Sequence, residues 1–399
     1  MRVGMVSIYP PPRSKHAKQG GVASYSKNLV DSLLKCCSVV VFAEKLSVLD
    51  DYYFEGAAVY RCWSKGAKYP FQIFKKLLEN RVDVVHVQYE TYLYGGLASA
   101  LVFPFLLALI RLLGNPVIVT MHGVIPLSRV NRCFLEENRI NGNPLIMRVG
   151  LALLVKIVVS LSNVVIVHEK NLRDILIKEY KCCASKFRVI YHGIEDPQFS
   201  ITPAEAKKKL GVRSKNVILF FGYITGYKNV DLLIESAQFL KVNDWVMLIA
   251  GGAHPRLSGD SSYLKYLSDL RKQASAISEE KILFKGFVPE EEISLYFSAA
   301  DLVVFPHNIC ISSSGPLSLA ASYGKPFLVS DSFRDIVGFD NIVFGDDPKE
   351  LASKIDFFFR DATFGFQILE YSKDFKDKRL WNRISLQTYE LYKEMALTD

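Results

Sequence analysis

Short apolar runs and helical patterns alternate along the whole chain. The apolar runs predict buried strands at residues 3–8, 82–88, 117–120, 164–167, 187–191, 217–221, 282–287, 302–305 and 327–329. Apolar residues at helical spacing follow several of them, as in the recurrence of Val22, Tyr25, Leu29 and Leu33. Parallel strands need helical crossovers, so this alternation predicts α/β domains with parallel sheets. At 399 residues the chain exceeds the usual size of a single core, and we expect two such domains.

The segment 301–331 predicts a strand, a turn and a helix that together suit an anion. Its strand ends at Pro306, the turn at 312–315 reads Ser-Ser-Ser-Gly, and Pro316 stands where the first helical turn tolerates a missing N–H. Hydroxyls and backbone N–H groups at the positive end of a helix favour a phosphate or diphosphate. An ordinary loop in which a serine caps the helix fits the same residues equally well.

Three further turns follow predicted strands. Gly20 and Gly21 precede a helical pattern, Gly222 opens a turn that leads to Lys228, and His122 follows the strand at 117–120. Glycines allow a ligand close to the backbone, and a lysine can meet a diphosphate as a point charge. Taken alone, a glycine pair is weak evidence, and a histidine at a strand end is more often structural.

These motifs together resemble those of retaining glycosyltransferases of the GT-B fold, in the large family 4 group. Met121-His122-Gly123 is similar to the family's T-x-H-G, and residues 222–228 are similar to its G-R-x-x-x-x-K turn. Residues 192–195 resemble its N-G-V-D turn, and 306–326 resemble its P-S-x-x-E-G-x-G-x-x-x-x-E-A-M-A-x-G-x-P signature, in the branch with an S-x-S-G turn. The resemblance covers almost the full chain.

The chain departs from the family pattern at its carboxylates and at one cation. The two family glutamates fall on Ile311 and Leu319, and the family arginine falls on Tyr223 or Thr225. Arg256 is the candidate for a relocated phosphate cation.

The resemblance implies a GT-B architecture of two Rossmann-like parallel-sheet domains that face a cleft. The acceptor-side domain would comprise residues 1–195, completed by a C-terminal helix at 377–399 that crosses back to it. The nucleotide-sugar domain would comprise residues 196–376, and the Pro- and Lys-rich segment 196–215 is the expected boundary.

The implied activity is retaining, metal-independent transfer of a sugar from a UDP- or GDP-linked donor to a glycan or polyprenyl-linked acceptor. His122 is expected to position the sugar, and Lys228 is expected to stabilise the leaving diphosphate while the donor phosphate assists front-face attack. The donor and diphosphate candidates are Gly20, Gly21, Gly222, Tyr223, Lys228, Ser313, Ser314, Gly315, Pro316 and Leu317. The acceptor-side candidates are His16, His168 and Glu169.

Several chemistries are excluded by missing motifs. No two aspartates are separated by one residue, so the D-x-D metal motif of the other glycosyltransferase fold is absent, as are HExxH, GxSxG and Walker loops. We therefore expect no metal and no cofactor. The seven cysteines lack C-x-x-C spacing and are expected to be reduced thiols of a cytoplasmic protein. A strand at the N-terminus predicts no signal peptide.

Positive charge is concentrated in the first half of the chain. Residues 1–195 hold 25 lysines and arginines against 14 aspartates and glutamates, a net of +11, whereas the remainder holds 24 against 27, a net of −3. No nucleic-acid motif accompanies this charge, so we expect an anionic membrane surface, at the inner face of the plasma membrane, and no nucleic acid.

Three apolar helical patterns bear on that membrane. The candidate contact is a basic amphipathic helix with Phe71, Phe74, Leu77 and Leu78 beside Lys75, Lys76 and Arg81. Packing of this helix on the sheet is the alternative. The stretches 97–113 and 144–161 are interrupted by charges or are short, so we expect core-packing helices there and no membrane span.

Two other functions remain open. The first is a non-catalytic paralogue that binds a sugar nucleotide or a partner enzyme, because such a protein could lack the family's glutamates and arginine. A GT-B epimerase or phosphorylase is the other alternative, but no motif marks the pyridoxal-bound lysine that a phosphorylase needs.

Overall fold

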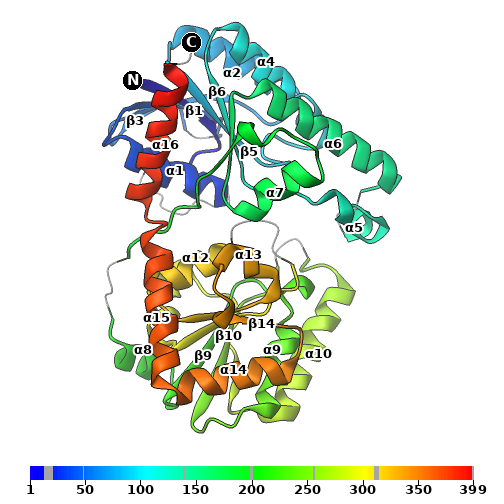
Figure 1. Ribbon diagram of the computed structural model, residues 1–399, viewed down its shortest axis with the longest axis vertical. Helices are drawn as coiled ribbons and strands as arrows, with labels where there is room; N and C mark the ends of the chain where they lie inside the picture. The colour runs from blue at the N-terminus through cyan, green and yellow to red at the C-terminus, as the bar shows by residue number, and fades with distance from the viewer. Residues whose placement is uncertain are drawn as a thin grey trace. The chain divides into compact units, whose positions relative to one another are not determined.

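The computed structural model forms two compact units (Figure 1). Unit 1 contains Met1–Gly193 and Trp381–Asp399, and unit 2 contains Ile194–Cys310 and Ser314–Leu380. The described residues are 1–12, 21–47, 49–137, 140–197, 201–254, 257–309 and 314–397. Of the residues predicted to matter for function, His16, Gly20, Arg256, Ile311 and Ser313 lie outside these ranges.

The sheet of unit 1 has eight strands in the order β3-β4-β2-β1-β5-β6-β7-β8. They are β1 (Arg2–Ser7), β2 (Ser38–Glu44), β3 (Tyr52–Phe54), β4 (Ala57–Trp63), β5 (Val84–Tyr89), β6 (Val117–Met121), β7 (Val164–Val167) and β8 (Phe187–Val189). All neighbours are parallel except the pair β3 and β4. The strand order reverses between β1 and β5, and open α/β sheets bind ligands at the carboxyl ends of strands at such a point.

Helices cover both faces of this sheet. They are α1 (Gly21–Leu33), α2 (Tyr69–Glu79), α3 (Leu97–Leu101), α4 (Phe103–Leu112), α5 (Arg132–Glu137), α6 (Pro144–Leu161), α7 (Lys170–Lys178) and α16 (Trp381–Ala396). On one face α1 packs against α16, and on the other α2 packs beside α4 and α4 beside α6 (Figure 1). The C-terminal helix α16 therefore returns to unit 1.

The sheet of unit 2 has six strands, all parallel, in the order β11-β10-β9-β12-β13-β14. They are β9 (Asn216–Phe221), β10 (Trp245–Ala250), β11 (Ile282–Phe284), β12 (Leu302–Phe305), β13 (Phe327–Ser330) and β14 (Val343–Phe344). Its order reverses between β9 and β12. The helices are α8 (Pro203–Lys209), α9 (Val230–Ser236), α10 (Ser261–Ser278), α11 (Ile293–Ala299), α12 (Gly315–Ser322), α13 (Arg334–Val337), α14 (Pro348–Arg360) and α15 (Ala362–Asp377).

Side-chain caps fix where several of these helices begin. Thr202 and Glu205 form a capping box at the start of α8. Asp260 accepts hydrogen bonds from the N–H groups of Ser262 and Tyr263 at the start of α10. Ser314 caps α12, the helix predicted from the turn at 312–315. Each cap contributes about 1 kcal/mol to the stability of its helix.

The helix α6 differs from the core helix that the sequence predicted. By length and composition it is the one helix among the described residues that could cross a membrane, yet only 22% of its residues are buried. Its buried side chains are Leu154, Val155, Val158 and Val159. The prediction of a core-packing helix is therefore correct for α4, whose inner face is buried, and wrong for most of α6.

Candidate active site

The described diphosphate candidates of unit 2 lie at the carboxyl edge of its sheet, whereas Gly21 belongs to unit 1. Strand β9 ends next to Gly222 and leads into a short 3-10 turn, Gly226–Lys228, whereas β12 ends at Phe305 and is followed by His307. Because β9 and β12 are neighbours where the strand order reverses, the loops after them lie side by side. The edge therefore has the position at which such sheets bind ligands.

Lys228 is a buried cation at this edge. Its side chain is 7% exposed, and burial lowers its pKa to about 8. A Cβ atom at Gly222 would stand 2.7 Å from Lys228 Nζ and 3.2 Å from Pro316 Cγ, and Gly222 has φ +122°, so only glycine fits there. Among the described residues, none forms a hydrogen bond or an ion pair with Lys228 Nζ. An ammonium group in this environment favours an anionic ligand.

Two other buried polar groups at this edge were not predicted from the sequence. His307 Nε2 and Thr225 Oγ1 are both buried and have no hydrogen-bond partner in the described part of the chain. Burial, together with the nearby charge of Lys228, lowers the pKa of His307 to about 3, so this imidazole is neutral at pH 7. An unpaired buried polar group costs about 1–3 kcal/mol, and a ligand that pairs with it recovers that cost.

The turn before α12 offers fewer groups to a ligand than the sequence suggested. Ser314 Oγ accepts a hydrogen bond from the N–H of Leu317 at 3.3 Å, so both groups serve the helix cap. The side chain of Leu317 is 2% exposed and belongs to the core, and Pro316 has no N–H. Gly315 is exposed, and its N–H has no partner among the described residues.

Exposed aromatic rings lie at the same edge. The rings of Tyr223 and Phe287 are stacked, with centroids 6.1 Å apart and planes at 23°, and His254 meets Tyr223 edge-on at 5.3 Å. Tyr223 is 37% exposed and Phe287 is 64% exposed. A Cβ atom at Gly252 would stand 2.9 Å from Phe287 Cβ, so this glycine allows the close packing. Flat exposed rings of this kind suit a nucleobase.

At the carboxyl edge of the sheet of unit 1, buried polar side chains form a hydrogen-bonded chain. It begins on α16, where the Tyr392 hydroxyl lies 2.6 Å from His86 Nδ1. His86 Nε2 lies 2.7 Å from Thr120 Oγ1 and 3.2 Å from Gln88 Nε2. The other end of the Gln88 amide, Oε1, lies 2.8 Å from His122 Nε2. The predicted catalytic histidine is therefore connected to the last helix.

The chain continues from His122 to His168 and ends on the backbone. His122 Nδ1 lies 3.3 Å from His168 Nε2, and His168 Nδ1 donates to the carbonyl of Ile190 at 3.0 Å. Burial and the neighbouring histidines lower the pKa of His122 well below its usual value, so it is neutral at pH 7. A neutral imidazole has a single N–H. When His122 Nδ1–H donates to His168 Nε2, His122 Nε2 has to accept a hydrogen bond, so the Gln88 amide must turn its NH₂ towards it. Both ring nitrogens of His122 are then occupied.

The histidines also belong to a cluster of rings around Tyr25. The ring of Tyr25 lies 4.8 Å from that of His122, 4.9 Å from His168, 5.2 Å from His192 and 5.2 Å from Trp381, measured between centroids. Tyr25 is on α1 and Trp381 begins α16, so the cluster joins both helices to the sheet. The sequence did not identify this cluster, because ring contacts between distant residues leave no local pattern.

The remaining predicted residues of unit 1 are placed apart from one another. Glu169 is buried and stands at the start of α7, directly after His168. Gly21 is the first residue of α1, and no described residue other than its chain neighbours and its own helix lies within 4 Å of where its Cβ would be. Backbone at a helix start is therefore accessible at Gly21.

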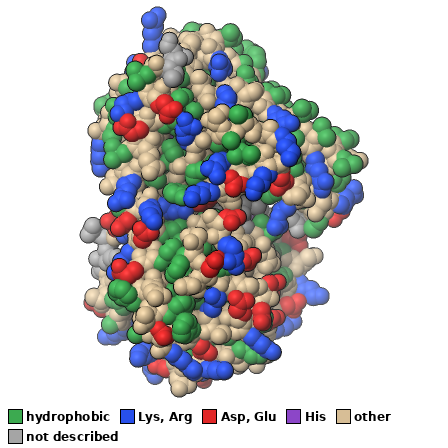
Figure 2. All heavy atoms as spheres, viewed as in Figure 1, with side chains coloured by type: hydrophobic (Ala, Val, Ile, Leu, Met, Phe, Trp, Pro, Cys, Tyr) green, Lys and Arg blue, Asp and Glu red, His purple; other side chains and the backbone are tan. Residues whose placement is uncertain are grey.

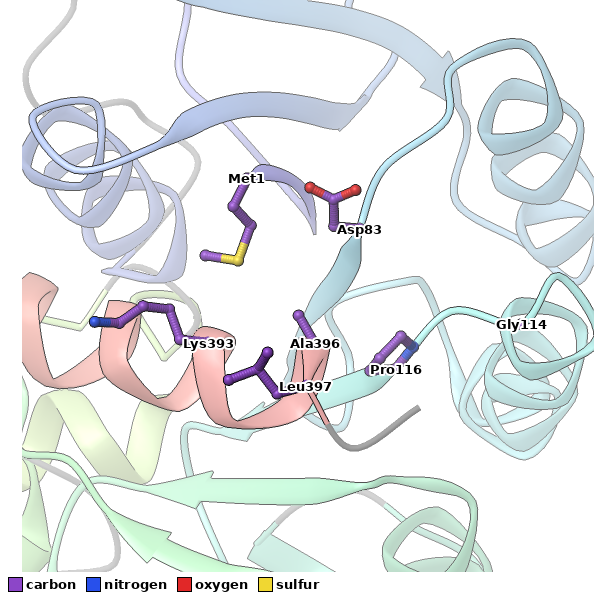
Figure 3. A pocket seen from close by; sticks show the side chains of 7 residues that line it. All are labelled: Met1, Asp83, Gly114, Pro116, Lys393, Ala396 and Leu397. Atoms are coloured by element: carbon purple, nitrogen blue, oxygen red, sulfur yellow. The ribbon is translucent and has the colours of Figure 1, made fainter.

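A hollow of about 480 Å³ lies at the opposite, amino-terminal edge of the first sheet (Figure 3). It is lined by Met1, Asp83, Gly114, Pro116, Lys393, Ala396 and Leu397. The Asp83 carboxylate there accepts a hydrogen bond from the backbone N–H of Arg2 at 2.7 Å. The hollow contains no predicted site residue, and its one carboxylate already has a partner, so it is not the candidate site.

No metal centre is built into the part of the chain that the structure describes. No group of three or more His, Cys, Asp or Glu residues there is placed to hold a metal ion. The six described cysteines are free thiols, and Cys310 lies outside the described residues. The expectation that the reaction needs no metal stays a prediction.

Comparisons with known proteins agree with this architecture. The model of Glycosyltransferase Family 4 matches residues 19–197, and the model of Glycosyl transferases group 1 matches residues 215–361. The sucrose-phosphate synthase of Thermosynechococcus elongatus superimposes with a TM-score of 0.75 at 15% identity and covers 100% of both chains. The Anabaena protein HepE in complex with UDP-glucose superimposes with a TM-score of 0.68 at 17% identity and covers 99% of this chain and 100% of that one.

Curated relatives match part of the chain. An uncharacterized glycosyltransferase of Methanocaldococcus jannaschii is 28% identical over 243 residues, which are 57% of this chain and 59% of that protein. The mannosylfructose-phosphate synthase of Agrobacterium fabrum is 25% identical over 185 residues, 40% of each protein. The matches therefore span less than two thirds of these relatives.

Two parallel-sheet Rossmann-like domains, with a C-terminal helix that returns to the first, define the protein as one of the GT-B class. The family models cover most of both domains. The chain belongs to the family 4 and group 1 glycosyltransferases.

Proposed function

We propose that the protein transfers a sugar, with retention of configuration, from a UDP- or GDP-linked donor to a glycan or polyprenyl-linked acceptor. Unit 2 binds the donor and unit 1 binds the acceptor. The observation that carries this proposal is Lys228, a buried ammonium without a counter-charge among the described residues, at the carboxyl edge where the strand order reverses. UDP-glucose bound to the Anabaena relative HepE supports a nucleotide-sugar donor.

Different residues of unit 2 bind different parts of the donor. Lys228 holds the diphosphate, Gly222 allows it to approach the backbone, and the neutral His307 donates its unpaired Nε2–H to a phosphate oxygen. The stacked rings of Tyr223 and Phe287 hold the nucleobase. The contact with Lys228 is charge-assisted and is therefore the stronger of the two phosphate contacts.

The transfer step depends on stabilising the leaving group. The bond between the anomeric carbon and the diphosphate oxygen breaks, and the acceptor oxygen forms its bond on the same face. The acceptor proton passes to the departing phosphate oxygen, so no protein general acid is required. Lys228 stabilises the negative charge that develops on the diphosphate. We assign a positioning role to His122. Its buried hydrogen bonds to Gln88 and His168 hold together the carboxyl edge of the sheet of unit 1, where we expect the transferred sugar.

A second function, a non-catalytic paralogue that binds a sugar nucleotide or a partner enzyme, is favoured by one observation. Leu319 stands where the family has a glutamate, and it packs against the core of unit 2. No carboxylate is available at this position to hold the donor sugar.

Incubation with a panel of UDP- and GDP-sugars separates the two functions. For a transferase, one donor releases its nucleoside diphosphate, and the first sugar product has the anomeric configuration of the donor by NMR. Saturable nucleotide binding without release of nucleoside diphosphate from any donor would favour the paralogue. Inverted product would contradict the proposed mechanism.

A further inference from the structure

Nearly half of the large hydrophobic side chains that are exposed among the described residues lie on four helices of unit 1. They are Phe71 and Leu78 of α2, Leu97 and Leu101 of α3, Phe105 and Leu112 of α4, and Leu145, Ile146, Val149, Leu153 and Ile157 of α6. We refer to these side chains as the apolar face. Figure 2 shows hydrophobic side chains gathered over α6, with lysine and arginine side chains beside them.

The outer side of α6 is apolar along its length. Ile146, Val149, Leu153 and Ile157 recur at spacings of three and four residues, and they are 73%, 60%, 55% and 45% exposed. The inner side is apolar too, because four further aliphatic residues pack on the core. A helix that is hydrophobic all round belongs in a protein core or in lipid. The outer side of α6 has no protein covering it within the described chain.

The apolar face is continuous from helix to helix. The helix α2 packs beside α4, and α4 packs beside α6. The exposed rings of Phe71 on α2 and Phe105 on α4 touch each other, with centroids 5.2 Å apart. Contiguous exposed apolar patches of this extent mark a surface that contacts a partner or a membrane.

The charges on these helices are almost all positive. These helices contain five basic residues and one acidic residue, Glu79. The basic residues are Lys75, Lys76, Arg111, Arg148 and Lys156. Three of the five, Lys75 on α2, Arg111 on α4 and Lys156 on α6, are exposed and form no ion pair with any described residue.

Lys76, which the sequence predicted as a membrane contact, is engaged elsewhere. Its Nζ pairs with Asp51 at 3.5 Å and with Glu79 at 3.3 Å. The predicted hydrophobic side of α2 is also divided, because Leu77 is buried whereas Phe71 and Leu78 are exposed. The exposed apolar surface of α2 is therefore smaller than the sequence predicted, and most of the apolar face is on α4 and α6.

We propose that the apolar face lies on an anionic lipid bilayer, with α6 and α4 in the interfacial plane and Lys75 and Lys156 against the lipid headgroups. Aliphatic and phenylalanine side chains flanked by lysine are typical of interfacial helices, whereas lysine is depleted in protein–protein interfaces. The inner side of α6 is packed on the sheet, so the helix lies in the surface and does not span it. This inference extends the proposed function, because contact with a bilayer would bring a polyprenyl-linked acceptor close to unit 1.

Flotation with lipid vesicles tests this without a donor or an acceptor. The full chain is mixed with vesicles of phosphatidylcholine alone, or with vesicles in which about a third of the lipid is phosphatidylglycerol. Binding to the anionic vesicles should be at least about tenfold tighter. It should weaken as salt rises from about 0.1 M to about 1 M, because the Debye length falls from about 10 Å to about 3 Å.

Two sets of variants locate the contact. Ile146→Ser/Val149→Ser/Leu153→Ser should lower vesicle affinity about tenfold or more, and Lys75→Glu/Lys156→Glu should lower it by a similar factor. The matched controls change exposed residues of unit 2, Leu264→Ser/Phe366→Ser and Lys208→Glu/Lys265→Glu, and should bind as the wild type does. All replaced side chains are exposed, so thermal unfolding should be unchanged and excludes misfolding as a cause.

Three results would overturn the inference: no binding of the wild type to either vesicle, equal binding of the α6 variant and the wild type, or loss of binding in the unit 2 controls alone. Light scattering adds a further one. A wild-type dimer that the α6 serine variant converts to a monomer, without vesicle binding, would assign the face to a second copy of the chain. Vesicle binding with no nucleotide binding would contradict the proposed function and leave this inference standing.

Discussion

The protonation state of Lys228 should make nucleotide binding depend on pH. The lowered pKa of about 8 means that the ammonium is present below this pH and is lost above it. A nucleoside diphosphate pairs with the charged form, so affinity for UDP or GDP should be highest below about pH 8 and then fall by up to about tenfold per pH unit.

The variant Lys228→Arg provides the control, because a guanidinium stays charged throughout this range. Calorimetric titrations between about pH 7 and pH 9 should show a decline for the wild type and a flatter profile for the variant. Parallel profiles would mean that another group titrates.

The buried histidines of unit 1 should weaken the fold in acid. The pKa of His86 is about 3 in the folded chain, and that of His122 is also lowered, against 6.5 for an unperturbed histidine. Between the folded and unfolded pKa values, the unfolded chain binds more protons than the folded chain does. The free energy of unfolding therefore decreases as pH falls below about 6.5. Each histidine contributes a slope of up to about 1.4 kcal/mol per pH unit.

In the variant His122→Asn, the free energy of unfolding should depend less steeply on pH, because one of the titrating histidines is gone. Urea unfolding at several values between about pH 6 and pH 4 measures it. An unchanged slope would show that the His122 imidazole is protonated in the folded chain, contrary to its lowered pKa.

Sequence reasoning reached residues that have a local signature and missed those that do not. Lys228 and Gly222 were predicted because glycine, a fixed spacing and lysine follow a strand, and the structure places them in contact range. His307 also follows a strand, but a single histidine there usually has a structural role. Gln88 was not predicted, because its importance comes from His86 and His122, which it joins through the fold.

At the scale of elements, α16 packs on unit 1 through apolar side chains, and one buried hydroxyl links it to the sheet within that contact. Tyr392 is fully buried, and its hydroxyl is 2.6 Å from His86 Nδ1. Tyr392→Phe keeps the ring and leaves His86 without this partner, so the free energy of unfolding should fall by about 1–3 kcal/mol.

Chemical denaturation measures this change, with Tyr389→Phe on the same helix as the control. Tyr389 is half-buried, and its substitution should change the free energy by less than about 0.5 kcal/mol. Equal effects of the two variants would show that the Tyr392 hydroxyl does not stabilise the attachment of α16.

Helices and strands were predicted correctly where the apolar pattern of the sequence allowed a single interpretation. The central strands β5, β6, β7, β9 and β12 lie where continuous apolar runs predicted them. The pattern misled at α6, because a helix that is apolar on all sides looks the same whether protein or lipid covers it. Burial within the folded chain distinguishes the two, and the sequence does not contain it.

At the scale of the whole molecule, the absence of a D-x-D motif predicts activity without a divalent cation. Once a donor is identified, turnover in excess chelator should equal turnover without it, because Lys228 and not a metal stabilises the leaving diphosphate. Rates of nucleoside diphosphate release measure this. Loss of activity that manganese or magnesium restores would contradict the mechanism.

The division into two domains was predicted from length and from the alternation of strands and helices. The return of α16 to unit 1 came from the family resemblance alone, since no local pattern shows which sheet a terminal helix covers. No single motif of the sequence specifies the sugar or the acceptor.

The central claim is that the carboxyl edge of the sheet of unit 2 holds a nucleoside diphosphate through Lys228. Calorimetric titration of UDP and GDP into the wild type, Lys228→Ala and Lys265→Ala tests it most directly. One nucleotide should saturate a single site on the wild type, and the control Lys265→Ala should bind it equally well. Lys228→Ala should bind it roughly tenfold to hundredfold more weakly, the loss of about 1.5–3 kcal/mol expected for one charge-assisted contact. Failure of both nucleotides to saturate the wild type, or equal affinity in Lys228→Ala, would contradict the claim.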